Sequence, residues 1–116
     1  MKINFREFEK TIIGDRVFGN ELMETQIEQF EDYLADLQEY IQDIPTISEL
    51  NFSNHKTKAS FKLFLLYDLL DQQQKMVESL EKNAMPNFKR CLENMIESCL
   101  ELIKELKKYL QQNSLT

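Results

Sequence analysis

Glycine and proline are scarce in this sequence, with only two of each among its 116 residues. Gly14 and Gly19 share one short segment, while Pro45 and Pro86 stand far apart. Few positions therefore interrupt a helix, which favours long helices. The chain is long enough for one domain with a modest core and too short for two, so we interpret residues 1–116 as a single domain.

Cysteines and long apolar runs are also few. Cys91 and Cys99 stand eight residues apart in a helical pattern, about 12 Å along the axis, so they cannot bridge to each other. The N-terminal segment has charges where a signal peptide needs apolar residues, and free cysteines fit a reducing compartment, so we expect a cytoplasmic protein. The longest strongly apolar segment, residues 61–70, is half the length of a membrane span and carries two charges, so we expect no membrane insertion.

Residue types that perform catalysis or bind metals are equally rare. The sole histidine, His55, lacks the glutamate three residues earlier that a di-iron helical bundle needs. Cys99 falls on a predicted core face and Cys91 beside it, where thiols usually pack as small apolar groups. No glycine-rich phosphate loop occurs, and one histidine in a loop or first helical turn cannot assemble a Ser-His-Asp arrangement. We therefore expect no catalytic residue, no metal and no cofactor, and interpret the chain as not an enzyme.

Apolar residues recur at spacings of three and four along four segments. Residues 4–13 predict a short helix, and Asn20 predicts the N-cap of a second helix that stops at Pro45. The apolar seam of this second helix is Met23, Ile27, Phe30, Leu34, Leu37, Ile41 and Ile44. A third helix is predicted over residues 55–83, and a fourth begins near Pro86. We expect an all-α fold, an antiparallel helical bundle of three long helices plus a short N-terminal helix, similar to a four-helix bundle.

The connection after Pro45 and the third helix have further features. Thr46 and Glu49 form a potential capping box for one extra helical turn. The third helix is apolar over too wide an arc to meet only one neighbour. Beside its seam lies a second apolar stripe, made of Phe61, Leu65, Leu69 and Met76.

We expect this second stripe to be buried against another element, because an exposed apolar patch of its size is unusual on a soluble monomer. We expect the short N-terminal helix to cover the stripe through Phe5, Phe8 and Ile12, or a second copy of the chain to do so. The second case makes a structural subunit or homodimer the alternative interpretation of the protein.

Positive charge is missing from a long segment, since no lysine or arginine occurs between Arg16 and Lys56. Residues 21–43 contain eight carboxylates and contribute −8, while the other 12 acids and the 14 bases contribute +2, which gives the net charge of −6. On a helical wheel most of these acids lie opposite the apolar seam. Neighbouring like charges on a helix cost a few tenths of a kcal/mol each. The segment is either a plain solvated face or a surface that docks on a basic protein.

The docking interpretation gives the predicted function, a small non-catalytic protein-binding module that acts as an adaptor or inhibitor. The residues expected to contact the basic partner are Glu24, Glu28, Asp32, Asp36 and Glu39. Charge attraction of this kind speeds encounter and fixes register. A nucleic-acid-binding protein is one such partner, with carboxylates in the place of phosphates. Direct nucleic-acid binding is not expected, because the net charge is negative and no aromatic residues are interleaved with the lysines.

Overall fold

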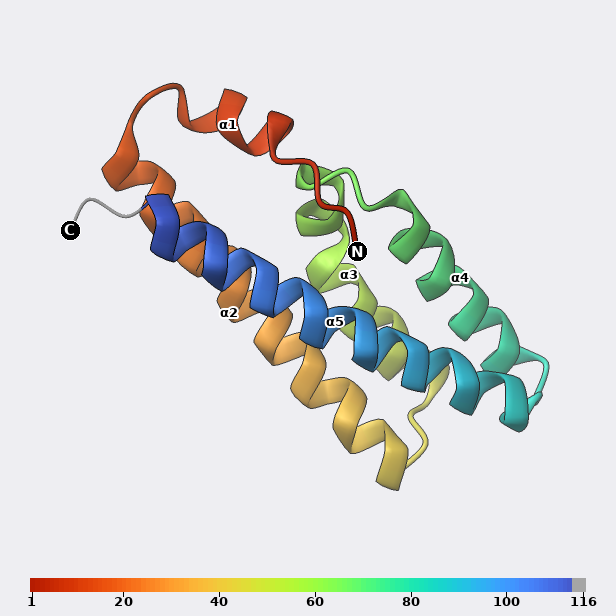
Figure 1. Ribbon diagram of the computed structural model, residues 1–116. Coiled ribbons are helices and arrows are strands. Elements are labelled where there is room, and N and C mark those ends of the chain that lie inside the picture. The colour runs from red at the N-terminus through yellow and green to blue at the C-terminus, as the bar shows by residue number, and fades with distance from the viewer. Residues whose placement is uncertain (114–116) are drawn as a thin grey trace.

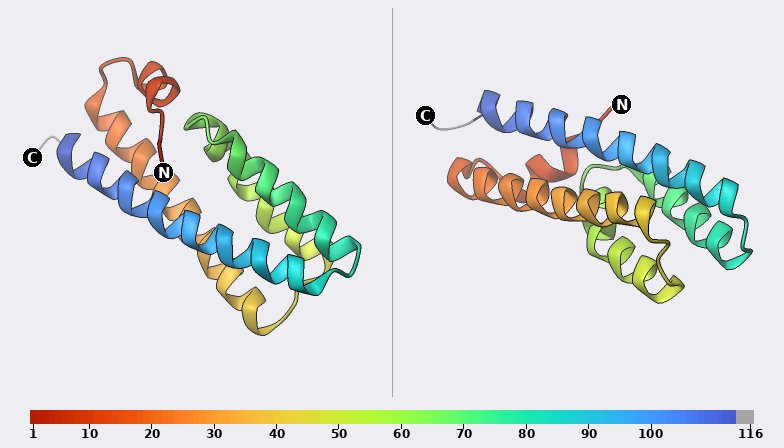
Figure 2. Two further views of the ribbon diagram at one scale, coloured as in Figure 1. Left: turned by 45° about the vertical axis from the view of Figure 1, so that its right-hand side comes forward. Right: turned by 90° about the horizontal axis from the view of Figure 1, so that it is seen from below.

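A computed structural model describes residues 1–113, and all regular structure within them is helical. The prediction of an all-α fold is confirmed. The helices are α1 (Arg6–Ile12), α2 (Arg16–Gln42), α3 (Ile47–Leu63), α4 (Tyr67–Glu81) and α5 (Met85–Asn113). Helices α2 and α5 run antiparallel along the length of the molecule, whereas α3 and α4 form a shorter hairpin beside them (Figures 1 and 2). The molecule measures 48 × 23 × 22 Å.

The single helix predicted over residues 55–83 is wrong, because the chain reverses after α3. Leu65 adopts a left-handed conformation with φ of 56°. Its N–H donates to the Lys62 carbonyl at 3.1 Å, and the N–H of Leu66 donates to the Phe61 carbonyl at 2.9 Å. These are the two hydrogen bonds of a Schellman motif, whose left-handed position usually carries glycine. Because leucine rarely adopts this conformation, the sequence did not indicate the turn. Residues 1–113 therefore form five helices instead of the expected four.

The starts of α2 and α3 also differ from the predictions. Helix α2 begins at Arg16 instead of after Asn20, because the carboxylate of Asp15 accepts the N–H of Phe18 at 2.9 Å and caps the helix. The capping box of Thr46 and Glu49 is present. It begins the whole of α3, however, and not a single extra turn.

The core lies inside a ring of four helices, in which α2 packs against α3 and α5, and α4 packs against α3 and α5. Two of the seven seam residues predicted for α2 lie outside this core: Ile41 is 50 % exposed, and Ile44, two residues beyond the last residue of α2, is 49 % exposed. A straight helix rotates by about 20° per heptad relative to a strict seven-residue repeat, so between Met23 and Ile41 the seam turns by about 50° away from the centre of the buried face. The seam residues that remain fully buried are Met23, Ile27, Phe30 and Leu37.

The second apolar stripe is covered within the chain. Phe61, Leu69 and Met76 are at most 1 % exposed, and Leu65 is half-buried at the α3–α4 turn. The ring of Phe61 stacks on Phe30 of α2, with the ring centres 5.2 Å apart. The main cover is therefore the bundle itself, neither α1 nor a second chain as expected. A homodimer through this stripe would have no exposed apolar surface there beyond Leu65.

Helix α1 instead closes one end of the bundle. Phe5 stacks on Tyr109 of α5 with ring centres 4.1 Å apart, and Phe8 packs against Phe64 after α3 with ring centres 5.9 Å apart. Phe8 is buried, whereas Phe5 and Ile12 are half-buried. Among residues 1–113, no helix is both long enough and apolar enough to span a bilayer.

Candidate functional site

The carboxylates of α2 fall into an outward group and two flanking positions. We name the outward group, Glu21, Glu24, Glu28, Asp32 and Glu39, the acidic face. All five are exposed. At 100° per residue they lie within about 80° of arc, and at 1.5 Å per residue they extend over about 27 Å. This side of α2 is exposed because α5 and α3 occupy the other two sides.

Both flanks of α2 are neutralised by lysines from neighbouring helices. On the α3 side, Asp36 lies 3.2 Å from Nζ of Lys56 and accepts a hydrogen bond from the Ser53 hydroxyl at 2.7 Å. On the α5 side, Glu31 lies 3.2 Å from Nζ of Lys107. Asp36, which we predicted to contact a partner, is thus engaged inside the chain.

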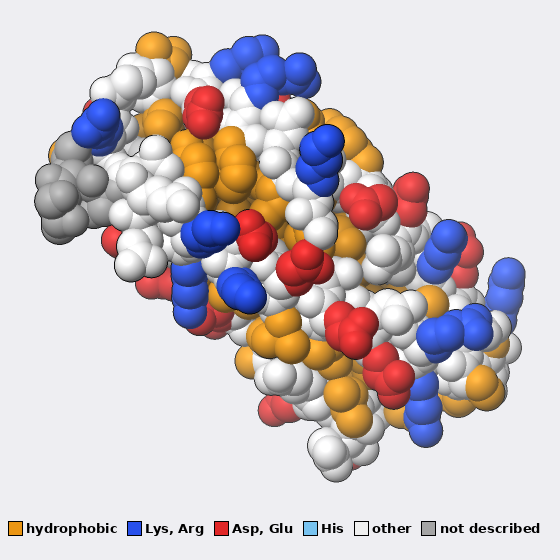
Figure 3. Space-filling model, viewed as in Figure 1, with side chains coloured by type: hydrophobic (Ala, Val, Ile, Leu, Met, Phe, Trp, Pro, Cys, Tyr) orange, Lys and Arg blue, Asp and Glu red, His pale blue; other side chains and the backbone are white. Residues whose placement is uncertain are grey.

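The other four predicted contact residues keep their charges unpaired within the part of the chain that the structure describes. Glu24, Glu28, Asp32 and Glu39 make no ion pair with any residue from 1 to 113. No lysine or arginine lies on α2 beyond Arg16. Helix α5 differs, because acidic and basic side chains lie next to one another along it (Figure 3). The acidic face therefore carries only negative charge, whereas the other long helix, α5, carries charges of both signs.

A layer of polar side chains holds α2 against α3, and we did not predict it. The Tyr33 hydroxyl donates to Oδ1 of Asn54 at 2.7 Å. The amide nitrogen of Gln73, from α4, donates to the Tyr33 oxygen at 3.1 Å and to Oγ1 of Thr57 at 2.8 Å. Desolvation raises the pKa of the buried Tyr33 above its ordinary value, so this phenol stays a neutral donor.

The polar layer continues toward both ends of the α2–α3 contact. The Ser60 hydroxyl is placed to donate to Gln29 at 2.6 Å, or to Gln26. The hydroxyls of Tyr40 and Ser53 lie 2.7 Å apart. Polar residues at helical spacing on both segments were the signal for this layer: Gln26, Gln29, Tyr33, Asp36 and Tyr40 on α2, and Ser53, Asn54, Thr57 and Ser60 on α3. These hydrogen bonds fix the position and rotation of α2, and therefore the direction in which the acidic face points.

Groups suited to nucleophilic or metal chemistry lie apart from one another. Cys99 is buried in the core, and desolvation raises the pKa of its thiol to about 12, so it is a poor nucleophile at neutral pH. Cys91 is half-buried on α5. His55 is exposed on the middle of α3. Within residues 1–113, no three or more His, Cys, Asp or Glu side chains group in a way that could hold a metal ion.

In comparisons with known proteins, no family model, no curated protein sequence and no solved structure matches this chain.

Proposed function

We propose that this chain is a small non-catalytic protein-binding module, an adaptor or inhibitor, that docks the acidic face of α2 on a basic surface of another protein. The observation that carries the proposal is the row of five exposed carboxylates along α2, none of which has an ion-pair partner within residues 1–113. Its two free cysteines fit a reducing compartment, and we place the module in the cytoplasm on that ground.

Energetics support a role for the acidic face beyond solvation. Like charges four residues apart, such as Glu24 with Glu28 and Glu28 with Asp32, destabilise a helix by a few tenths of a kcal/mol per pair. One lysine in the row would remove this cost. A surface of one sign raises the rate of encounter with an oppositely charged partner and disfavours wrong partners. Because α2 is fixed on both sides, little ordering of the helix itself remains to oppose binding.

Exposed apolar residues at the N-terminal end of α2 extend this surface. Val17 is 57 % exposed and Phe18 43 %, and both precede Glu21 by one turn or so. Ile13, before the helix, is 84 % exposed. Buried aromatic anchors contribute much of the energy of protein interfaces, whereas exposed charges mostly affect rate. The partner that fits this surface has a row of basic residues ending at an apolar pocket.

A nucleic-acid-binding protein is one partner of suitable charge. The acidic face carries about one charge per 7 Å, whereas one DNA strand carries one per ~3.4 Å of helix axis. The face therefore offers about half the charge density of a strand. If the partner uses a nucleic-acid site for docking, duplex DNA should displace the chain from it.

The test uses two variants with equal changes in charge. The acidic-face variant carries Glu28→Lys and Asp32→Lys, and the matched control carries Glu93→Lys and Glu97→Lys on α5. Each pair is exposed and four residues apart on a long helix, and lysine has a helix propensity close to that of glutamate. Partners captured from a lysate of the source cells are identified by mass spectrometry, purified and measured by calorimetry at 0.05 M and 0.3 M salt.

We expect the acidic-face variant to bind the purified partner at least tenfold more weakly than the parent, and the control variant to bind within about twofold. Binding by the parent should weaken with salt, because the Debye length shortens from about 14 Å to about 6 Å over this range. Circular dichroism should show equal helix content in all three proteins. If the acidic-face variant folds and binds as tightly as the parent, the face is only solvated and the proposal is wrong.

A further inference from the structure

A cavity of about 260 Å³ lies between α1, α2 and α5. No residue of α3 or α4 lines it, because these shorter helices flank the other part of the α2–α5 pair (Figure 1). At this end of the molecule, the seven-residue α1 lies beside the α2–α5 pair in the place of α3 and α4. The cavity is slightly below the usual range for small-molecule sites, about 300 to 1,000 Å³, which limits its occupant to a small molecule.

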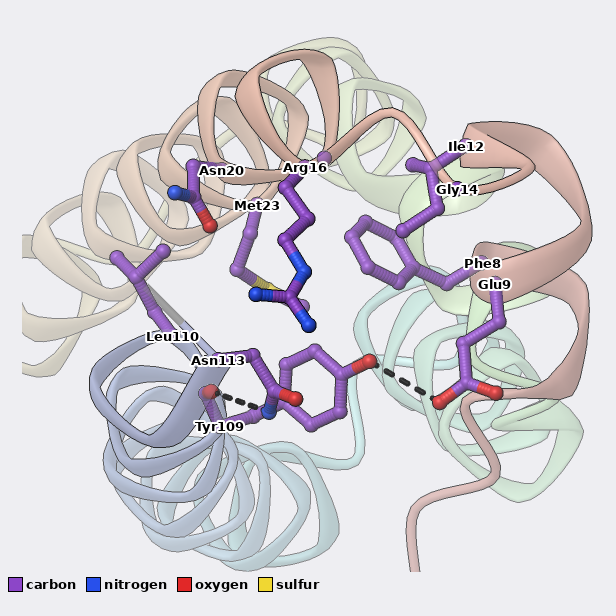
Figure 4. Close-up of a pocket in the computed structure, with 11 residues that line it drawn as sticks. Phe8, Glu9, Ile12, Gly14, Arg16, Asn20, Met23, Tyr109, Leu110 and Asn113 are labelled. Atoms are coloured by element: carbon purple, nitrogen blue, oxygen red, sulfur yellow. Dashed lines mark hydrogen bonds between the residues drawn. The ribbon is translucent and has the colours of Figure 1, made fainter. Parts of the chain in front are cut away.

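The inner walls of this cavity are apolar. Phe8 and Met23 are each 1 % exposed, and Leu110 lies opposite them on α5 (Figure 4). Gly19 lines the cavity where α1 crosses α2, and a Cβ atom there would come within 2.9 Å of Cδ1 of Ile12. The absence of a side chain at this position lets Ile12 of α1 lie close to α2.

Two charged residues line the same cavity, but only one of them already has a partner. The carboxylate of Glu9 accepts a hydrogen bond from the Tyr109 hydroxyl at 3.0 Å. Desolvation, together with this carboxylate, raises the pKa of Tyr109 to about 12, so the phenol remains a neutral donor.

Arg16 makes no ion pair with any residue from 1 to 113. Its guanidinium extends into the cavity, over the space between Met23 and the ring of Tyr109 (Figure 4). The cavity thus combines apolar walls with one cation whose planar donors remain available, which is an arrangement that pairs with a carboxylate.

We propose that this cavity binds a small amphipathic carboxylate. The carboxylate pairs with Arg16, and the apolar body lies among Phe8, Met23 and Leu110. An amine is disfavoured because the guanidinium of Arg16, which extends over the space between Met23 and Tyr109, repels it there, whereas Glu9 lies beyond the Tyr109 hydroxyl (Figure 4). This site is separate from the acidic face of α2 and does not depend on it.

The test compares three ligands that share an eight-carbon chain: octanoate, 1-octanol and octylamine. Binding is followed on the intact protein by NMR through the methyl groups of Met23, Ile12 and Leu110. We expect octanoate to shift these resonances to saturation and to bind about tenfold more tightly than 1-octanol, because a charged hydrogen-bonded pair replaces solvent contacts. Octylamine should bind more weakly than 1-octanol.

Variants then assign the selectivity to Arg16. Arg16→Gln should weaken octanoate binding about tenfold and leave 1-octanol unchanged, while Arg16→Lys should retain part of the preference. Lys10→Gln is the matched control, because it removes one exposed cation from α1 outside the cavity and should change nothing.

Three results would each overturn the proposal. The first is octanoate leaving the cavity methyl groups unshifted, and the second is octylamine binding as tightly as octanoate; both are read on the parent chain and need no variant. The third is Arg16→Gln binding octanoate as tightly as the parent. Partner capture by the acidic face should be unaffected by Arg16→Gln, so failure of this proposal and failure of the docking proposal are distinguishable.

Discussion

Helix α2 packs against α5 and α3 through different chemistry. Against α5 it contributes to an apolar core with one exposed ion pair, Glu31 with Lys107, at the edge. Against α3, beside the stacked rings of Phe30 and Phe61, it presents hydroxyls, amides and a carboxylate that hydrogen-bond to polar side chains of α3. Apolar burial contributes about 25 cal/mol per Å² and has little direction. A hydrogen bond contributes only about 1 kcal/mol net but requires its geometry. We therefore expect the α5 side to supply more of the stability and the α3 side to set the rotation of α2.

The largest effect should come from truncating the apolar side. Leu102→Ala on α5 removes a side chain with 0 % exposure, and we expect a loss of about 2 to 5 kcal/mol in the free energy of unfolding, measured in urea. Leu100→Ala, two residues earlier and 51 % exposed, is the control and should cost about 0.5 kcal/mol or less. Equal losses in the two variants would contradict the placement of α5.

The polar side should show a smaller loss with strong coupling. Tyr33→Phe and Asn54→Leu each leave a buried partner without its hydrogen bond, so each should cost about 1 to 3 kcal/mol. The double variant removes both partners and should cost less than the sum, with a coupling energy of about 0.5 to 3 kcal/mol. Strict additivity in urea unfolding would show that this hydrogen bond does not join α2 to α3.

A still smaller effect is expected at the edge of the polar layer. Lys56→Gln removes the cation beside Asp36, but both side chains are partly exposed, at 43 % and 28 %, and Ser53 still donates to the carboxylate. We expect a loss of at most about 1 kcal/mol. The difference between variant and parent should shrink at 1 M salt, where screening is strong. A loss that stays constant from low to high salt would argue against an ionic contribution.

The start of α3 should give the smallest effect, which depends on pH. Hydrogen bonds from the backbone N–H and the hydroxyl of Thr46 lower the pKa of Glu49. A carboxylate with a lowered folded pKa stabilises the fold above its unfolded pKa, and this contribution disappears as the pH falls through the folded pKa. The Tm of the parent should therefore decline more between pH 6 and pH 3 than that of Glu49→Gln. Identical declines would show that the cap contributes no pH dependence.

Much of this architecture was predictable because its causes are local. Pro45 ends α2, Thr46 and Glu49 cap α3, and apolar spacing places Cys99 in the core. The exposure of Glu24, Glu28, Asp32 and Glu39 follows from the same helical spacing. Partner binding by these residues stays a prediction.

Other features were not predictable from apolar spacing alone. The α3–α4 turn depends on a left-handed leucine that tertiary packing imposes. The engagement of Asp36 depends on residues of α3 that are far away in sequence. The cavity beside Arg16 is lined by residues of α1, α2 and α5, and α1 approaches α2 closely at Gly19. Each of these depends on contacts between elements, which a search for one helix's apolar face does not detect.

The placement of α1 has a consequence for the order of folding. Its hydrogen bond to α5, Glu9 with Tyr109, joins residues 100 apart in the chain, whereas Leu66 closes the α3–α4 turn onto Phe61, five residues away. The α2–α5 contact also closes a long loop, as in Glu31 with Lys107, 76 residues apart, but α1 offers only one fully buried side chain, Phe8, against the entropy of its own ordering. We therefore expect α1 to dock after the other helices and to open first by local unfolding, with the fastest amide hydrogen exchange of any helix. The cavity would then exchange its contents through transient opening of α1 while the α2–α5 core stays intact.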